Sequence, residues 1–195
     1  MFSAEFLRHR SEVARALASH KYEVNDYGFY IPSMKANVGG VMDTWLNYRE
    51  HQVHKNLMPV EGRDYMLDVA AHGAVQVGTW FTALYEDNAT PASTWTGGNF
   101  NSVANEFTQY DELLRPEYDE APSANGVLTN SANRADFTIA TGVLAHNLYG
   151  AALLESSAKL SVTGKLLAAS AFSAPRVVNA TDILSVQYTL TLTST

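Results

Sequence analysis

Residues 183–195 have the sequence ILSVQYTLTLTST, in which apolar and polar side chains alternate. Successive side chains along a β-strand point to opposite faces of the sheet, so this strand would have one apolar and one polar face. Such a strand is typical of an antiparallel sheet that packs one face on a core and exposes the other. The stretch therefore predicts a β-rich domain with a strand over residues 183–193.

The composition favours a globular protein held together by burial alone. Hydrophobic residues make up 46% of the 195 residues, and the lack of cysteine excludes disulfides and thiolate metal sites. No apolar run approaches the roughly 20 residues of a membrane-spanning helix. The net charge is −7 and no basic stripe is present, so neither a membrane nor nucleic acid is expected as a partner.

Residues 40–195 are predicted to form one β domain. A short helix is expected over residues 61–73, ending at Gly73, and the polar segment 87–106 is expected to be a loop. The spacing of the apolar segments favours an antiparallel β-sandwich, with jelly-roll and immunoglobulin-like strand orders both open. The predicted strands cover residues 41–48, 80–85, 107–110, 126–130, 134–140, 148–155, 164–169 and 183–193.

Residues 1–39 are predicted to form an N-terminal arm. Residues 3–20 place apolar side chains on one face of a helix, with Ser3 as its N-cap. Residues 21–40 are rich in aromatic side chains, which favours an ordered extended segment that ends in a turn at Gly39 and Gly40. Two interpretations stay open, because the helix could dock on another subunit or lie on its own domain.

Large apolar side chains of the arm are the candidate partner-binding residues, since aromatic residues often dominate the energetics of interfaces. Trp95 is a further candidate because it falls in the predicted loop, whereas Trp45 and Trp80 fall in apolar strands and are assigned to the core. The candidates are Phe2, Phe6, Leu7, Tyr22, Tyr27, Phe29, Tyr30 and Trp95.

No catalytic, cofactor-binding or metal-binding residue is predicted, and the chain is expected not to be an enzyme. His51 and His54 are three residues apart, which places them on opposite faces of a strand rather than around one metal ion. The acidic segment YDELLRPEYDEAP, residues 110–122, could supply paired carboxylates for glycoside hydrolysis, but no apolar pocket that would raise one pKa is evident. We interpret this segment as solvated charge or as a contact with a basic partner.

Three blocks of the sequence resemble small virion proteins of tailed bacteriophages. The first block is HKNLMPVEGRDYMLDVAAHGAVQVGTWFTALYED, residues 54–87. The second is FTQYDELLRPEY, residues 107–118, and the third is VLTNSANRADFTI, residues 127–139. The matching residues are His54, Asn56, Leu57, Gly62, Leu67, Asp68, Gln76, Trp80, Leu84, Tyr110, Arg115, Pro116, Asn130, Ser131, Ala132 and Phe137.

YGAALLES, residues 149–156, and GKLLAASAFSAPRVVNATDILSVQYTLTLT, residues 164–193, resemble the ending of the same family, in which an alternating strand closes the domain. The resemblance covers about residues 40–195 and implies a structural virion protein without enzymatic activity. We favour a capsid decoration (cement) protein, assembled in the host cytoplasm, that binds the major capsid protein. It would also bind copies of itself, as a homo-oligomer such as a trimer. A tail or head-to-tail joining protein is the alternative. Two readings from other classes are a carbohydrate-binding module that uses Trp95 and a hydrolase that uses the acidic segment.

Overall fold

The computed structural model describes residues 22–24, 30–32 and 36–194. The chain divides into two compact units, one made of Met1–Asn37 with Thr193–Thr195 and the other of Val38–Leu192. In the first unit, β1 (Tyr22–Val24) and β2 (Tyr30–Pro32) pair antiparallel. The helix expected over residues 3–20 lies outside the described residues, so it stays a prediction.

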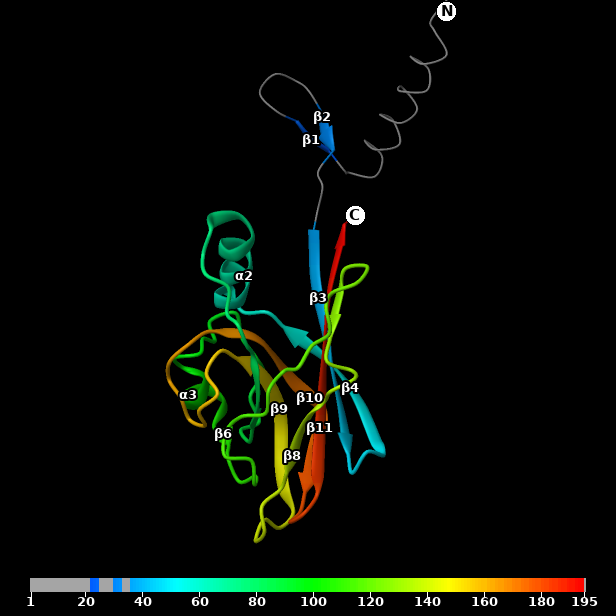
Figure 1. The fold of residues 1–195 in the computed structure, drawn as a ribbon, viewed down its shortest axis with the longest axis vertical. Coiled ribbons are helices and arrows are strands. Elements are labelled where there is room, and N and C mark those ends of the chain that lie inside the picture. The colour runs from blue at the N-terminus through cyan, green and yellow to red at the C-terminus, as the bar shows by residue number, and fades with distance from the viewer. Residues whose placement is uncertain (1–21, 25–29, 33–35, 195) are drawn as a thin grey trace, which may run out of the picture. The chain divides into compact units, whose positions relative to one another are not determined.

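The described strands of the larger unit form one antiparallel sheet that curls into a half-barrel (Figure 1). The strand order is β6-β5-β9-β10-β4-β3-β11-β7, and β8 pairs with β11. The mainly β, antiparallel class expected from the sequence is confirmed, but a sandwich of two facing sheets is not. The strands are β3 (Ala36–Leu46), β4 (Glu50–Leu57), β5 (Phe81–Tyr85), β6 (Glu106–Phe107), β7 (Val127–Thr129), β8 (Ala135–Thr138), β9 (His146–Leu154), β10 (Leu166–Val178) and β11 (Ile183–Ser194).

Strand β4 makes the sheet continuous because it changes partner along its length. Its first residues pair with β3, with His51 opposite Trp45, and its last two residues pair with β10. The register of β10 against β9 shifts between Ala171 and Arg176, and Pro175 lies in this irregular stretch. A bulge tolerates proline and increases the local twist, which is how a long strand such as β10 bends around a core.

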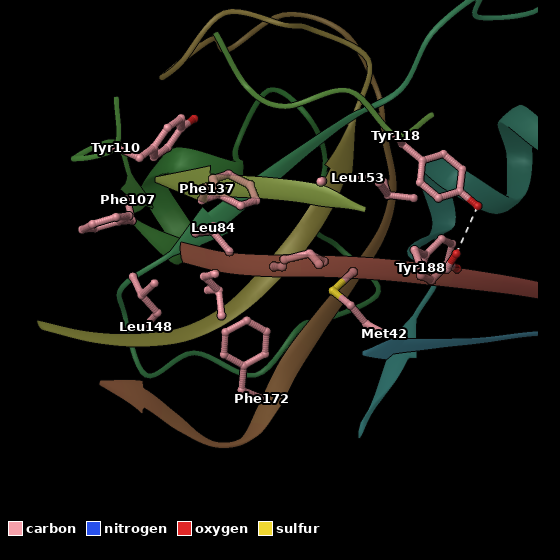
Figure 2. Close-up of a cluster of buried hydrophobic side chains, with 14 of the residues drawn as sticks. Met42, Leu84, Phe107, Tyr110, Tyr118, Phe137, Leu148, Leu153, Phe172 and Tyr188 are labelled. Atoms are coloured by element: carbon pink, nitrogen blue, oxygen red, sulfur yellow. Dashed lines mark hydrogen bonds between the residues drawn. The ribbon is translucent and has the colours of Figure 1, made fainter. Parts of the chain in front are cut away.

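The core of the half-barrel is formed by apolar side chains from strands that are far apart in sequence (Figure 2). Strand β11 crosses this core and buries Leu184, Val186 and Tyr188, as its alternation predicts. Ser185, on the face expected to be polar and wet, is buried too. The strand over Ile183–Ser194 is therefore confirmed, whereas its second face is only partly exposed.

In the part of the chain that the structure describes, two α-helices accompany the sheet. Helix α2 (Val60–Leu67) continues as a π-helical turn, η1 (Asp68–His72), and ends at Gly73 with a φ of 75°, which confirms the predicted helix and its end. Helix α3 (Phe100–Ala104) lies within the segment that was expected to be entirely loop. It forms because Phe100 and Ala104, one helical turn apart, are both fully buried.

The turn expected at Gly39 and Gly40 is wrong, because both residues lie inside β3. At Gly40 the sheet brings two side chains close to the backbone: an added Cβ would lie 2.6 Å from the hydroxyl of Tyr188 and 2.8 Å from Oδ1 of Asn56. Asn56 Nδ2 also donates a hydrogen bond of 2.6 Å to that hydroxyl. Glycine is needed here for close approach and not for a turn.

Candidate functional site

A fully buried ion pair holds the acidic segment in place. Nε and Nη2 of Arg115 donate to the two carboxylate oxygens of Glu106, each at 2.7 Å, and neither side chain is exposed. Nη1 of Arg115 donates to the backbone oxygen of Ser156, and the backbone N–H of Leu160 donates to Glu106. Glu106 precedes the segment 110–122 that is interpreted as solvated charge, and its carboxylate joins two loops.

Lys159 fastens the same two loops a second time. Its Nζ donates to the backbone oxygens of Thr108 and Tyr110 and lies 3.6 Å from the centre of the Tyr110 ring. Burial lowers the pKa of Lys159 and raises the pKa of Tyr110. The loop between these anchors carries Leu113, whose side chain is 92% exposed. Leu113 is thus exposed on a loop that internal contacts hold at Tyr110 and at Arg115.

His54 belongs to a buried hydrogen-bond network. Its Nδ1 accepts from the backbone N–H of Ser173, so the neutral ring carries its proton on Nε2 and donates to Oγ1 of Thr44 at 2.9 Å. Arg176 also donates to Thr44 Oγ1 and to the backbone oxygen of Glu50. Burial, reinforced by the charge of Arg176, lowers the pKa of His54 to about 4.

His51 lies on the other face of the sheet, as its spacing from His54 predicts. Its ring stacks on Trp45 with a centroid distance of 4.6 Å, and its Nε2 lies 2.7 Å from Oδ1 of Asp43. The guanidinium of Arg134 lies 3.7 Å from the centre of the Trp45 ring. Among the described residues, no group of three or more His, Asp or Glu side chains could hold a metal ion.

A shallow cleft of about 370 Å³ lies beside the start of β9. Its centre is an acid–imidazole pair, with His146 Nε2 at 2.7 Å from Oε2 of Glu86. Asn105 Nδ2 donates to the second oxygen of Glu86 at 2.8 Å. These two contacts hold the Glu86 carboxylate in place, and Glu86 in turn orients the His146 ring.

A pocket with both polar and apolar lining residues, here called the β11 pocket, opens next to β11 with a volume of about 90 Å³. Within it, the hydroxyl of Tyr118 donates to the backbone oxygen of Tyr188 at 3.2 Å (Figure 2). The pocket is hollow beside Gly78, since an added Cβ there would meet no atom within 4 Å. It is lined by Gln76, Val77, Gly78, Trp80, Tyr118, Glu120, Leu128, Leu167, Tyr188 and Leu190.

Large apolar side chains are exposed at several loops of the larger unit. Val75, in the loop after η1, is 91% exposed, and Leu144, before β9, is 81% exposed. Together with Leu113, these residues expose apolar surface that another protein could cover. The described residues thus combine internally bonded polar groups with exposed apolar ones.

The predicted site residues fall in different places. Trp95 is only 5% exposed and makes edge-on contacts with Tyr85 and Phe100, so its ring is part of a second core and is not a surface contact. Tyr22 and Tyr30 belong to β1 and β2. Phe2, Phe6, Leu7, Tyr27 and Phe29 lie outside the described residues.

Two of the three tryptophans were assigned wrongly to the core or to the surface, and only the fold corrects them. Trp95 lies in a loop as expected, but it is buried against Phe100 of α3 and is not a surface contact, and Trp45, expected in the core, is half-buried on the outer face of β3. Trp80 is buried as expected. Sequence reasoning also missed the Glu106–Arg115 pair and the β11 pocket, because each joins segments that no local pattern connects.

No family model matches this chain, and no curated protein matches it either. In the described part of the chain, no helix has both the length and the apolar character needed to cross a bilayer. Its function is therefore inferred from its own sequence and geometry.

Proposed function

We propose that this chain is a non-enzymatic structural protein of a tailed-phage virion. Specifically, it acts as a capsid decoration protein that binds the major capsid protein and copies of itself. The N-terminal arm, residues 1–39, is part of this proposal as an anchor on neighbouring subunits. The order of the three sequence blocks is the reason for choosing this class of protein.

The proposal rests on one observation: the candidate acid–base side chains are hydrogen-bonded within the protein, whereas several large apolar side chains are exposed to solvent. The candidate acid–base groups Glu86, Glu106 and His54 are each held by two or more internal hydrogen bonds. Leu113 and Val75 are instead almost fully exposed on loops of a well-packed body. Covering Leu113 and Val75 with another protein would remove their apolar surface from water, which supports a structural role.

Cofractionation with virions tests the proposal directly. The chain is co-expressed with the head and tail proteins encoded in its own genome, and heads are separated from tails on a density gradient. We expect the protein in the head fraction, and we expect heads that carry it to dissociate at a higher temperature than heads without it. Recovery only in the tail fraction would favour the joining-protein alternative, and absence from both fractions would overturn the virion role.

A variant pair tests the contact surface. Leu113→Ser removes an exposed apolar side chain from the loop held by the Glu106–Arg115 pair, and should weaken attachment to heads. Thr163→Ala changes an exposed polar residue and serves as the control. Equal attachment of both variants would exclude Leu113 from the contact.

A further inference from the structure

Another cleft, here called the Arg134 cleft, lies where the turn between β3 and β4 meets the start of β8. Its volume is about 330 Å³, and it is lined by Tyr48, Ser131, Ala132, Arg134 and Asp136. Tyr48 belongs to the turn between β3 and β4, whereas the other four residues lie in β8 or just before it. Sites for small ligands have volumes of roughly 300 Å³ or more, so the cleft is large enough for a small molecule or for one side chain of another protein.

The guanidinium of Arg134 is held over an aromatic ring. It lies 3.7 Å from the centre of the Trp45 ring, which in turn stacks on His51. Asp43 holds His51 through a contact of 2.7 Å. Attraction between a guanidinium and an indole restricts the arginine side chain before any ligand binds, which lowers the entropy lost on binding. In the described part of the chain, no hydrogen bond or ion pair occupies the N–H donors of Arg134.

The cleft offers hydrogen-bond donors rather than acceptors. The hydroxyl of Tyr48 donates to Oδ2 of Asp136 at 2.9 Å, and Oδ1 of Asp136 is buried away from solvent. Asp136 is therefore poorly placed to bind a cation. Ser131 is exposed, and its hydroxyl makes no hydrogen bond to the residues that the structure describes. A ligand that pairs with Arg134 and Ser131 must supply acceptor atoms.

Tyr48 has a backbone conformation that bulky residues rarely adopt. The turn between β3 and β4 has positive φ at both central residues, 51° at Asn47 and 60° at Tyr48. Such turns favour glycine at the second position, because a larger residue is strained there. Strained residues cluster at ligand-binding sites. Here the side chain of Tyr48 forms one wall of the cleft and holds the carboxylate of Asp136.

A carboxylate matches the Arg134 cleft better than a phosphate does. The two oxygens of a carboxylate pair with the parallel N–H groups of a guanidinium in one plane. The lining carries one positive charge, on Arg134, and one negative charge, on Asp136. A phosphate with two negative charges would therefore meet one cation with an aspartate beside it, which is unfavourable.

We propose that the Arg134 cleft binds a carboxylate group, with Arg134 donating to both carboxylate oxygens, Ser131 donating beside it and the ring of Tyr48 as a wall. The group could belong to a small carboxylic acid or to an acidic side chain of another protein. Both sources present the same chemistry, and the experiment distinguishes them. This inference goes beyond the proposed virion role and does not depend on it.

NMR titration of the full-length protein tests the proposal. The probes are benzoate and benzamide, which have nearly the same shape but differ in charge. The signals to follow are Nε–H of Arg134 and the indole N–H of Trp45. We expect benzoate to shift both signals with a dissociation constant at least about tenfold lower than that of benzamide. Inorganic phosphate, the third probe, should bind more weakly than benzoate.

A pair of blocked peptides distinguishes the two sources of the carboxylate. Acetyl-Leu-Glu-Leu-amide carries a single side-chain carboxylate, and acetyl-Leu-Gln-Leu-amide is its neutral control. Tighter binding of the acidic peptide than of benzoate would identify a site for an acidic side chain of another protein. Tighter binding of benzoate would identify a site for a small carboxylic acid. Either result supports a carboxylate site.

Three variants examine Arg134 through the indole signal of Trp45. Arg134→Gln removes the charge and should raise the dissociation constant for benzoate about tenfold or more. Arg134→Lys keeps the charge but loses the planar pair of donors, so it should recover only part of the affinity. Arg63→Gln removes an exposed arginine of α2, outside the lining of the cleft, and should bind benzoate as the wild type does.

Tyr48→Gly distinguishes an effect on binding from an effect on folding. Glycine adopts a positive φ without strain, so the variant should fold with nearly the wild-type melting temperature. Its affinity for benzoate should nevertheless fall roughly threefold or more, because the cleft loses an aromatic wall and Asp136 loses its hydrogen-bond donor.

Three outcomes would overturn the inference: benzoate that binds no more tightly than benzamide, phosphate that binds at least as tightly as benzoate, or an Arg134→Gln protein that keeps the affinity of Arg63→Gln. Failure here is distinguishable from failure of the virion role. A protein that cofractionates with heads but does not bind benzoate would keep that role without a carboxylate site.

Discussion

His54 is the residue through which acid should act on stability. Burial, with the charge of Arg176, lowers its pKa to about 4 in the folded protein, against about 6.5 in an unfolded chain. Between these values the unfolded state binds more protons, so stability is full above about pH 6.5 and falls as the pH drops toward 4. The loss is on the order of 3 kcal/mol, to be measured by urea unfolding at pH 7, 6, 5 and 4.

Two variants distinguish the contribution of His54 to the pH dependence of stability from that of other titrating groups. His54→Gln can still donate to Thr44 and accept from Ser173 but cannot titrate, so its stability should depend less on pH over the same window. His72→Gln replaces an exposed histidine and should keep the wild-type dependence. If all three proteins show the same slope, His54 is not the responsible group.

Breaking the Glu106–Arg115 ion pair should strongly lower the free energy of unfolding. Glu106→Gln leaves the guanidinium of Arg115 buried without a counter-charge, and such changes cost roughly 3–5 kcal/mol. Asp119→Asn, at an exposed position of the same acidic segment, should stay within about 0.5 kcal/mol of wild type. Urea unfolding measures both.

A double variant tests whether this cost comes from the unpaired charge. Glu106→Gln with Arg115→Met removes the guanidinium as well, so it should be less destabilised than the sum of the two single changes. Strict additivity would contradict that explanation.

At the scale of elements, Gly40 fixes how closely β3 approaches β11 and β4. Gly40→Ala would place a methyl group against the hydroxyl of Tyr188 and the amide of Asn56 and should destabilise by about 1–3 kcal/mol. Gly78→Ala meets no atom within 4 Å and is the matched control. Thermal melts of the two variants should differ clearly, and equal melting temperatures would mean that the sheet relaxes around the added methyl.

Elements were predictable where one local pattern decides them. The alternation of residues 183–193 identified β11, and Gly73 marked the end of the helix. Strand β10 was predicted only to residue 169 because Ser173 and Pro175 interrupt its apolar pattern, and the bulge that tolerates them depends on β9 and β4. Helix α3 was missed because it is only five residues long, which is too short to show a helical repeat of apolar residues. Its stability comes from the burial of Phe100, which the sequence around it does not reveal.

At the scale of the whole molecule, the class of the domain followed from the sequence but the arrangement of its strands did not. A single curled sheet depends on β4 pairing with β3 through Lys55 and with β10 through Asn56 and Leu57. Nothing in the sequence around these residues specifies two different partners. The candidate site was harder still to predict, since the β11 pocket joins residues from 76 to 190.

Removal of residues 1–21 tests whether the N-terminal arm is needed for attachment while the larger unit folds without it. The core of the larger unit is built from its own residues, so the truncated protein should keep a cooperative unfolding transition, with a free energy of unfolding within about 1 kcal/mol of the full chain. It should also lose both self-association and attachment to heads, measured by sedimentation and by cofractionation. The variant Leu144→Ser, which changes an exposed loop, should keep both. Full attachment of the truncated protein would show that the exposed loops suffice, and that the arm is not the anchor.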